Sequence, residues 1–293
     1  MTTTAVTLLV LFWWMAPASQ APVVQSPVPS QAPLRAPLSA ELTRRIREAV
    51  RLDYQTQADY TYVERRRDVK ISRLGKVTIG PVRTFQVLPS PVVGQTYKRL
   101  IAVDDKPLSP EELAKRDAEH AADLKEAQAR QARETPSERA ERLERAASEQ
   151  REREEILDDA FKAFEATVER REIVDGVPVL VARMRPRKDP PVKTREGRWM
   201  SHFEGYLWVA ESDAQIVKID MRAASDLTIG WGVVGRVHKG TRVLYARRRV
   251  ESAWLPSETT YEASGRTLIF RPFQFTVTTT YSDYRRRDKS VAD

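Results

Sequence analysis

Alternation of apolar and other residues dominates the last third of the chain. Between residues 199 and 284, aromatic and β-branched side chains recur at every second position, which is typical of strands that pack one face on a core. Turn-forming residues at 211–214, 238–240, 252–253 and 264–266 divide the region into successive antiparallel strands. Strands this long must either stack on another sheet or curve around something.

The first half of the chain begins with a helix and continues as strands. Ser39 stands in the N-cap position before an apolar stripe, which predicts an amphipathic helix over residues 39–52. Asp175-Gly176 predicts a tight hairpin turn, and residues 186–198 form a basic, proline-containing loop. Further strands are predicted at 57–71, 76–88, 95–103, 164–173 and 177–186.

A charged helical segment interrupts the strands. Residues 109–160 consist almost entirely of Ala, Glu, Arg, Lys, Gln and Asp, a helix-forming composition. Ser109-Pro110 and Thr135-Pro136 mark two helix starts, so the segment is predicted to be a helical hairpin. The sequence thus predicts a mainly β (α+β) fold: a curved, half-open antiparallel β-barrel, covered by helices at 39–52 and 153–163, with this hairpin inserted.

Apolar residues on four strands suggest one continuous face. A wide curved sheet with little covering helix leaves a groove, and such grooves hold apolar ligands such as a lipid or an acyl chain. The alternative is an ordinary core between sheet and helix with no cavity. The candidate ligand-binding residues are Val179, Val181, Leu207, Val209, Val217, Ile219, Met221, Phe273, Phe275 and Val277.

Three arginine triplets lie in or beside predicted strands, at 65–67, 247–249 and 285–287. Because side chains alternate along a strand, at least one arginine of a fully paired triplet points inward and needs an anionic partner. We therefore take Arg66 and Arg248 as candidate contacts to a ligand headgroup. The alternative is that the triplets sit at strand ends and are solvated.

The N-terminal end of the chain indicates export. Residues 1–21 have the short apolar run and small-residue site of a cleavable signal peptide, with an uncleaved anchor as the alternative. Residues 22–38 form a proline-rich, disordered leader. The chain has no cysteine, which excludes a lipid-anchored lipoprotein and disulfides. A folded domain over 39–284 in the periplasm, followed by a loose basic tail over 285–293, is the predicted organisation.

The net charge of +8 has two interpretations. Nucleic acid is a common partner of basic chains, but export argues against it. An anionic membrane surface fits an exported protein better, and simple solubility is the alternative.

No catalytic constellation is found. The three histidines, His120, His202 and His238, have no second ligand at metal spacing. Nucleophile and phosphate-loop motifs are missing as well, and Asp104-Asp105 belongs to a turn. We therefore expect a non-enzymatic protein with neither metal nor cofactor.

Four short segments resemble the outer-membrane lipoprotein-sorting proteins, the LolA-like superfamily. Within this group, the resemblance is strongest to an uncharacterised exported branch. They are Gly205–Val209, Gln215–Ile219, Trp254–Pro256 and Tyr281–Tyr284. The resemblance covers residues 40–108 and 164–284, and the charged helical insertion departs from the family pattern. It implies a half-open barrel lined with apolar residues and lidded by helices, in a group whose better-known members carry lipoprotein acyl chains.

The function expected from these patterns is a non-catalytic periplasmic carrier of an apolar chain. The alternative is an envelope interaction protein, in which the charged helical hairpin docks an outer-membrane or other envelope protein and the barrel is a scaffold.

Overall fold

A computed structural model describes residues 35–72, 75–89, 96–229, 235–267 and 271–287. The predicted signal peptide and residues 22–34 of the predicted leader lie outside these residues, so both remain predictions. The last leader residues do not: Ala36–Pro37 form strand β1, which pairs with β7 through Thr167 and Val168.

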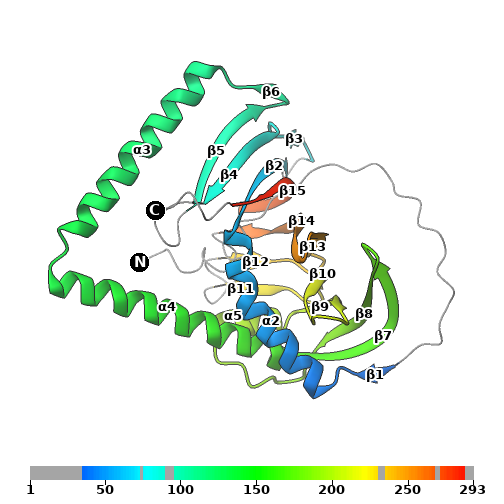
Figure 1. Ribbon diagram of the computed structural model, residues 1–293. Helices are drawn as coiled ribbons and strands as arrows, with labels where there is room; N and C mark the ends of the chain where they lie inside the picture. Colours follow the sequence, from blue (N-terminus) through cyan, green and yellow to red (C-terminus); the bar gives the residue numbers. More distant parts are fainter. Residues whose placement is uncertain (1–34, 73–74, 90–95, 230–234, 268–270, 288–293) are drawn as a thin grey trace.

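One curved antiparallel sheet makes up most of the molecule (Figure 1). Its main path is β1-β7-β8-β9-β10-β13-β14-β15-β2-β4-β5-β6, so the sheet is open, with β1 and β6 at its two edges. This confirms the predicted half-open, mainly β fold. Beyond β1, the strands are β2 (Tyr60–Ile71), β3 (Val77–Ile79), β4 (Arg83–Pro89), β5 (Thr96–Val103), β6 (Lys106–Pro107), β7 (Phe164–Val174), β8 (Val177–Pro186), β9 (Phe203–Ala210), β10 (Ile216–Ala223), β11 (Leu227–Ile229), β12 (Gly235–Val237), β13 (Arg242–Val250), β14 (Ala253–Thr267) and β15 (Arg271–Arg286).

Helix α2 (Ala40–Ala58) lies across one face of the sheet (Figure 1). Ser39 caps it as predicted, because its hydroxyl accepts a hydrogen bond from the Leu42 amide at 3.2 Å. The helix continues past residue 52, the predicted end. Its apolar stripe packs through the fully buried Ile46 onto Leu207 and Val209 of β9.

The inserted helices are α3 (Pro110–Ala132) and α4 (Pro136–Ala163), and both start with a capping box. No residue of α3 is buried. The two helices diverge from their connecting turn (Figure 1). Helix α3 packs on β5 near one edge of the sheet, whereas the end of α4 packs on β7 and on α5 (Arg195–Met200) near the other. We call α3, α4 and their turn the strap, because it connects the two edges.

Several predicted boundaries are wrong. The strand expected over 76–88 is split into β3 and β4, because the Gly80 amide turns to bond the Asp68 carbonyl at 2.7 Å. No break occurs at 264–266, where β14 stays paired with β15. The basic loop at 186–198 contains the start of α5. Arg285 and Arg286 belong to β15 rather than to a loose tail.

Candidate functional site

The ten residues predicted to share one apolar face lie on both faces of the sheet. Paired residues of neighbouring strands point to the same side, and Val181 pairs with Trp208 whereas Leu207 pairs with Ala182. Val181 and Leu207 are therefore on opposite faces. The single continuous face predicted from the sequence is wrong.

Three of the predicted ligand residues belong to the face away from α2. Val179, Val181 and Val217 are at most 1% exposed and form a core with Trp208 and Trp254. The tips of hairpins β7–β8 and β13–β14 meet at this core, where the Arg249 amide donates to the Asp175 carboxylate at 2.9 Å. These valines hold the fold together, and the structure separates them from the other seven.

Three more residues lie underneath α2. Leu207, Val209 and Ile219 pack against the Ile46 side of the helix. Helix α2 crosses the sheet where β9, β13 and β15 end, since Arg45 bonds the Ser212 carbonyl at 2.9 Å and the Arg287 amide bonds the Asp59 carbonyl at 2.7 Å. We call this the α2 end of the sheet and the opposite strand ends the distal end.

A row of apolar side chains crosses four strands toward the distal end, on the same face as α2. Met221 pairs with Val243, Val243 with Tyr261, and Tyr261 with Val277. We call this row and the two phenylalanines that extend it along β15 the distal patch: Met221, Val243, Tyr261, Phe273, Phe275 and Val277.

The distal patch is only partly covered. Met221 and Tyr261 are buried, and the other four side chains are half-buried. The rings of Phe273 and Phe275 stack with centroids 5.8 Å apart. Gly265 pairs with Phe273, and a Cβ added there would lie 2.5 Å from the Phe273 ring. The glycine therefore leaves room for this ring on the sheet surface.

Charged residues border the patch on the next strand. Asp68 and Lys70 of β2 pair with Val277 and Phe275, and Arg66 pairs with the next residue of that face, Thr279. Asp68 contacts Arg66 at 2.9 Å and Arg83 at 3.8 Å. Two cationic groups thus contact one carboxylate, and Lys70 follows on the same face of β2. The predicted headgroup contact Arg66 lies beside three of the predicted ligand residues.

Between the patch and α2 the same face becomes polar. Thr259 and Thr279 pair there and are 1% exposed. Glu64 is 2% exposed and binds the Lys98 ammonium group at 2.6 Å. Burial raises the pKa of Glu64, and Lys98 opposes this shift. On β14, β15 and β2, buried polar groups therefore separate the distal patch from the contacts under α2, whereas on β10 Met221 directly follows Ile219 on the same face.

The other predicted headgroup contact is at the α2 end. Arg248 lies over the Tyr284 ring, 5.7 Å from its centroid, on a strand three places from β2. Arg66 and Arg248 therefore do not border the same opening. The expectation that they would contact one headgroup at one mouth is wrong.

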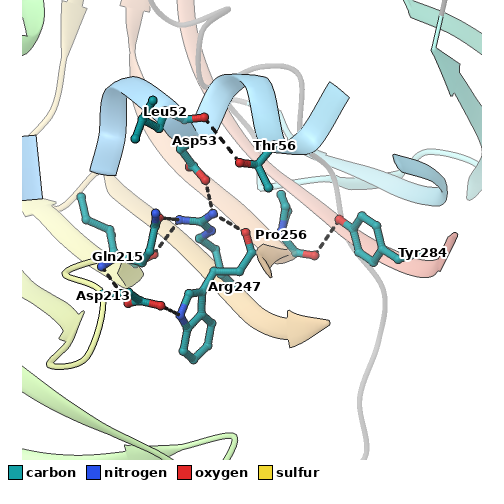
Figure 2. A network of polar contacts seen from close by, with 10 residues as sticks. Leu52, Asp53, Thr56, Asp213, Gln215, Arg247, Pro256 and Tyr284 are labelled. Carbon is teal, nitrogen blue, oxygen red and sulfur yellow. Dashed lines mark hydrogen bonds and ion pairs between the residues drawn. The ribbon is translucent and has the colours of Figure 1, made fainter. Parts of the chain in front are cut away.

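The inward-pointing arginine is Arg247, which sequence reasoning did not select. Its side chain is 3% exposed. It donates to the Gln215 side chain at 3.1 Å and the Ile216 carbonyl at 3.0 Å, as well as to the Trp254 carbonyl and the Asp53 carboxylate of α2 (Figure 2). Burial raises the pKa of Asp53, and Arg247 opposes this shift. This network fastens α2 to the sheet.

The histidines form no site in the part of the chain that the structure describes. His120 stacks on Tyr97 at 3.8 Å where α3 meets β5, and His202 bonds Ser225 at 2.7 Å. Among the described residues, no group of three or more histidines and carboxylates is placed to hold a metal ion. Within the same residues, no helix has the length and apolar character needed to cross a membrane.

Three solved structures are similar to this chain. A DUF1329 family protein from Desulfovibrio piger matches at 10% identity and a TM-score of 0.27, over 87% of this chain and 96% of its own. A LolA superfamily protein from Nitrosomonas europaea matches at 10% identity and a TM-score of 0.25, over 84% and 93%. A Vibrio parahaemolyticus domain described as an outer-membrane lipoprotein-sorting protein matches at 7% identity and a TM-score of 0.26, over 84% and 93%.

The superfamily that the sequence resembles is therefore among the structural matches. No family model matches the sequence, and no curated protein does. Because the identities and TM-scores are low, the function has to be inferred from the side chains of this chain.

Proposed function

We propose that the protein is a non-catalytic carrier that binds an apolar chain, such as a lipid or a lipoprotein acyl group, on the distal patch in the periplasm. The observation that supports this is the cross-strand row from Met221 to Val277, which ends in half-buried side chains beyond the reach of the α2 contacts. An ordinary core between sheet and helix would have these side chains covered.

The dimensions of the patch suit a single chain. Four neighbouring strands span about 14 Å, and the stretch of β15 from Phe273 to Val277 is about 13 Å long. An acyl chain that buries about ten methylenes there gains about 8 kcal/mol before the cost of immobilisation. Binding in the micromolar range or weaker is therefore expected.

The charges beside the patch favour an anionic headgroup. Arg66, Lys70 and Arg83 lie close to the carboxylate of Asp68, and Arg66 also acts on the Glu64 carboxylate, which binds Lys98. A carboxylate or phosphate at the end of the bound chain would meet a cluster that carries two more positive than negative charges. A neutral chain of equal length should bind less tightly.

The test introduces a charge into the patch. Phe275→Glu should abolish binding of a fluorescent fatty acid, because the carboxylate would have to be desolvated beside Phe273. Ile173→Glu is the matched control, since Ile173 is 56% exposed on β7, outside the patch. Val209 is unsuitable because it is fully buried under α2, and a charge there would unfold the protein.

Circular dichroism must show that both variants stay folded. If the parent protein binds no fatty acid, or if Phe275→Glu binds as well as Ile173→Glu, the carrier proposal is wrong.

A second candidate function uses the strap as a docking element for an envelope protein. The strap, residues 110–163, carries 16 acidic and 11 basic residues, so its net charge is −5 and the rest of the chain is +13. Such a segment could attract a basic partner. A carrier purified from the periplasm should bring lipid with it, whereas a scaffold should bring protein that crosslinks to the strap.

A further inference from the structure

An exposed apolar surface lies on the hairpin of β2 and β3. Ile71 pairs with Val77 and Val69 pairs with Ile79, so all four side chains project from one face. Val77 is 54% exposed and Ile79 is 68% exposed, and the other two are half-buried. We call these four residues the outer hairpin face.

This surface is on the opposite side of the sheet from the distal patch. Lys70 pairs with Phe275 of the patch, and its neighbours Val69 and Ile71 therefore point the other way. The hairpin is at the distal end of the sheet, and β3 lies at the margin, away from α2, α4 and α5 (Figure 1). No contact with these helices is described for β3, whose three residues are all exposed.

Basic side chains border the outer hairpin face. Arg67 is exposed on the same face, two residues before Val69, whereas the exposed Lys70 and Lys76 alternate with the apolar residues and project from the other face. The carboxylate next to these residues in β2, Asp68, is on the other face and binds Arg66. The surface is thus apolar at its centre and has one cationic residue, Arg67, beside it on the same face.

The size of this surface decides between two partners. A stable dimer buries roughly 20–30 residues on each side, far more than the four residues of the outer hairpin face. A bilayer needs only a few apolar side chains to enter its interface when basic residues meet anionic headgroups at the same time.

We propose that the outer hairpin face docks the protein on an anionic lipid surface. Val77 and Ile79 enter the interface, Arg67 meets the headgroups on the same face, and Lys76 reaches them from the edge of the hairpin. This docking does not depend on ligand binding at the distal patch, because the two surfaces are on opposite faces.

The test measures co-sedimentation with vesicles. It uses the full protein with the N-terminus that it has after export from its producing cell. One set of vesicles contains phosphatidylglycerol and phosphatidylethanolamine, and the other contains only phosphatidylcholine. Val77→Ser with Ile79→Ser removes the apolar centre, and Arg67→Gln with Lys76→Gln removes two charges. Leu143→Ser is the matched control, because Leu143 is 55% exposed on α4, away from the hairpin.

The double serine variant should lose at least about tenfold in partitioning to the anionic vesicles, since it gives up two aliphatic side chains. The double glutamine variant should lose about fivefold for each charge removed. It should behave like the parent on phosphatidylcholine, and the control should behave like the parent on both. Residues 1–34 are common to all variants, so differences report on the hairpin.

Equal partitioning of the parent and the double serine variant would overturn the proposal. The proposal would also be overturned if the double serine variant had a lower molecular mass than the parent in sedimentation equilibrium while its vesicle binding was unaltered. The surface would then join two copies of the chain. If the double serine variant unfolds, the glutamine variant decides alone: unchanged partitioning to anionic vesicles would refute the docking.

Discussion

The fastening of α2 by Asp53 and Arg247 allows a sharp test. Asp53→Ala would leave the Arg247 guanidinium, which is 3% exposed, without its charged partner. The three remaining acceptors are a side-chain amide and two backbone carbonyls. Breaking one side of a buried ion pair costs about 3–5 kcal/mol, and we expect the free energy of unfolding to fall by this amount.

Asp53→Asn should cost much less, about 1 kcal/mol, because the amide oxygen still accepts a hydrogen bond. The pKa of Asp53 is raised in the folded protein, mainly by burial. Its contribution to stability is therefore present below the unfolded pKa of about 4 and is lost as the pH rises through the folded pKa. Relative to the parent, the asparagine variant should become more stable between pH 3 and pH 7.

A double-mutant cycle measures the pair itself. Arg247→Leu should also destabilise by about 3 kcal/mol, and adding Asp53→Ala to it should cost little more. Urea unfolding followed by tryptophan fluorescence and circular dichroism gives the four free energies. If the losses of unfolding free energy in the two single variants add up in the double variant, the ion pair in Figure 2 does not fasten the helix.

The same variants separate stability from ligand binding. The pair is at the α2 end of the sheet, and the distal patch is at the other end. Folded Asp53→Asn should therefore bind a fluorescent fatty acid within about twofold of the parent, less than 1 kcal/mol of binding free energy. A larger loss would show that the α2 end takes part in the site.

Three further predictions concern other parts of the molecule. Arg242 lowers the pKa of Asp220 through two hydrogen bonds, so Asp220 contributes stability that is present above about pH 4 and is lost as the pH falls. Asp220→Asn should therefore lower the free energy of urea unfolding by about 1 kcal/mol at pH 7 and should have no effect near pH 2. An effect that does not change with pH would contradict this. Gly265→Val should clash with the Arg236 carbonyl oxygen of β12 and with the Phe273 ring, and the folded variant should bind fatty acid at least fivefold more weakly in a fluorescence titration. Unchanged affinity would exclude this part of the patch from the site. Asp117→Ala removes the hydrogen bonds between α3 and two side chains of β5. It should accelerate proteolysis within α3 and change the free energy of urea unfolding by about 1 kcal/mol or less. Protease resistance equal to that of the parent would show that α3 is held in another way.

Local signals in the sequence located most elements. All three helix starts marked by Ser39, Ser109 and Thr135 are N-caps in the structure. Each hydroxyl satisfies a backbone amide that the helix itself cannot satisfy, so the signal is physical and short-range. The long alternating segments were equally informative, because burial of one face imposes the period.

The assignment of residues to faces failed where that period is lost. Strand β8 is apolar at successive positions, Val179 to Ala182, so alternation cannot decide which residues face α2. A bulge between Ile216 and Lys218 places Val217 and Ile219 on opposite faces, although they are two residues apart. A bulge leaves no mark in a single sequence.

The choice of arginine failed for a related reason. A triplet shows that some side chain points inward, but not which one. The β13–β14 pairing shifts between Ala246 and Arg247, and the anionic partner, Asp53, is on a helix far away in the sequence. Only the three-dimensional structure connects the two.

The strap links the angle between α3 and α4 to the curvature of the sheet. Its two helices, of 23 and 28 residues, are rods of about 35 and 42 Å joined at one turn, and their outer ends rest near opposite edges of the sheet. Any change in the distance between the edges must change the angle between α3 and α4 or separate one helix from the elements that it contacts. A pair of spin labels, one near the middle of each rod, would therefore report on the opening of the sheet as a change in a single distance, with no label on the sheet itself.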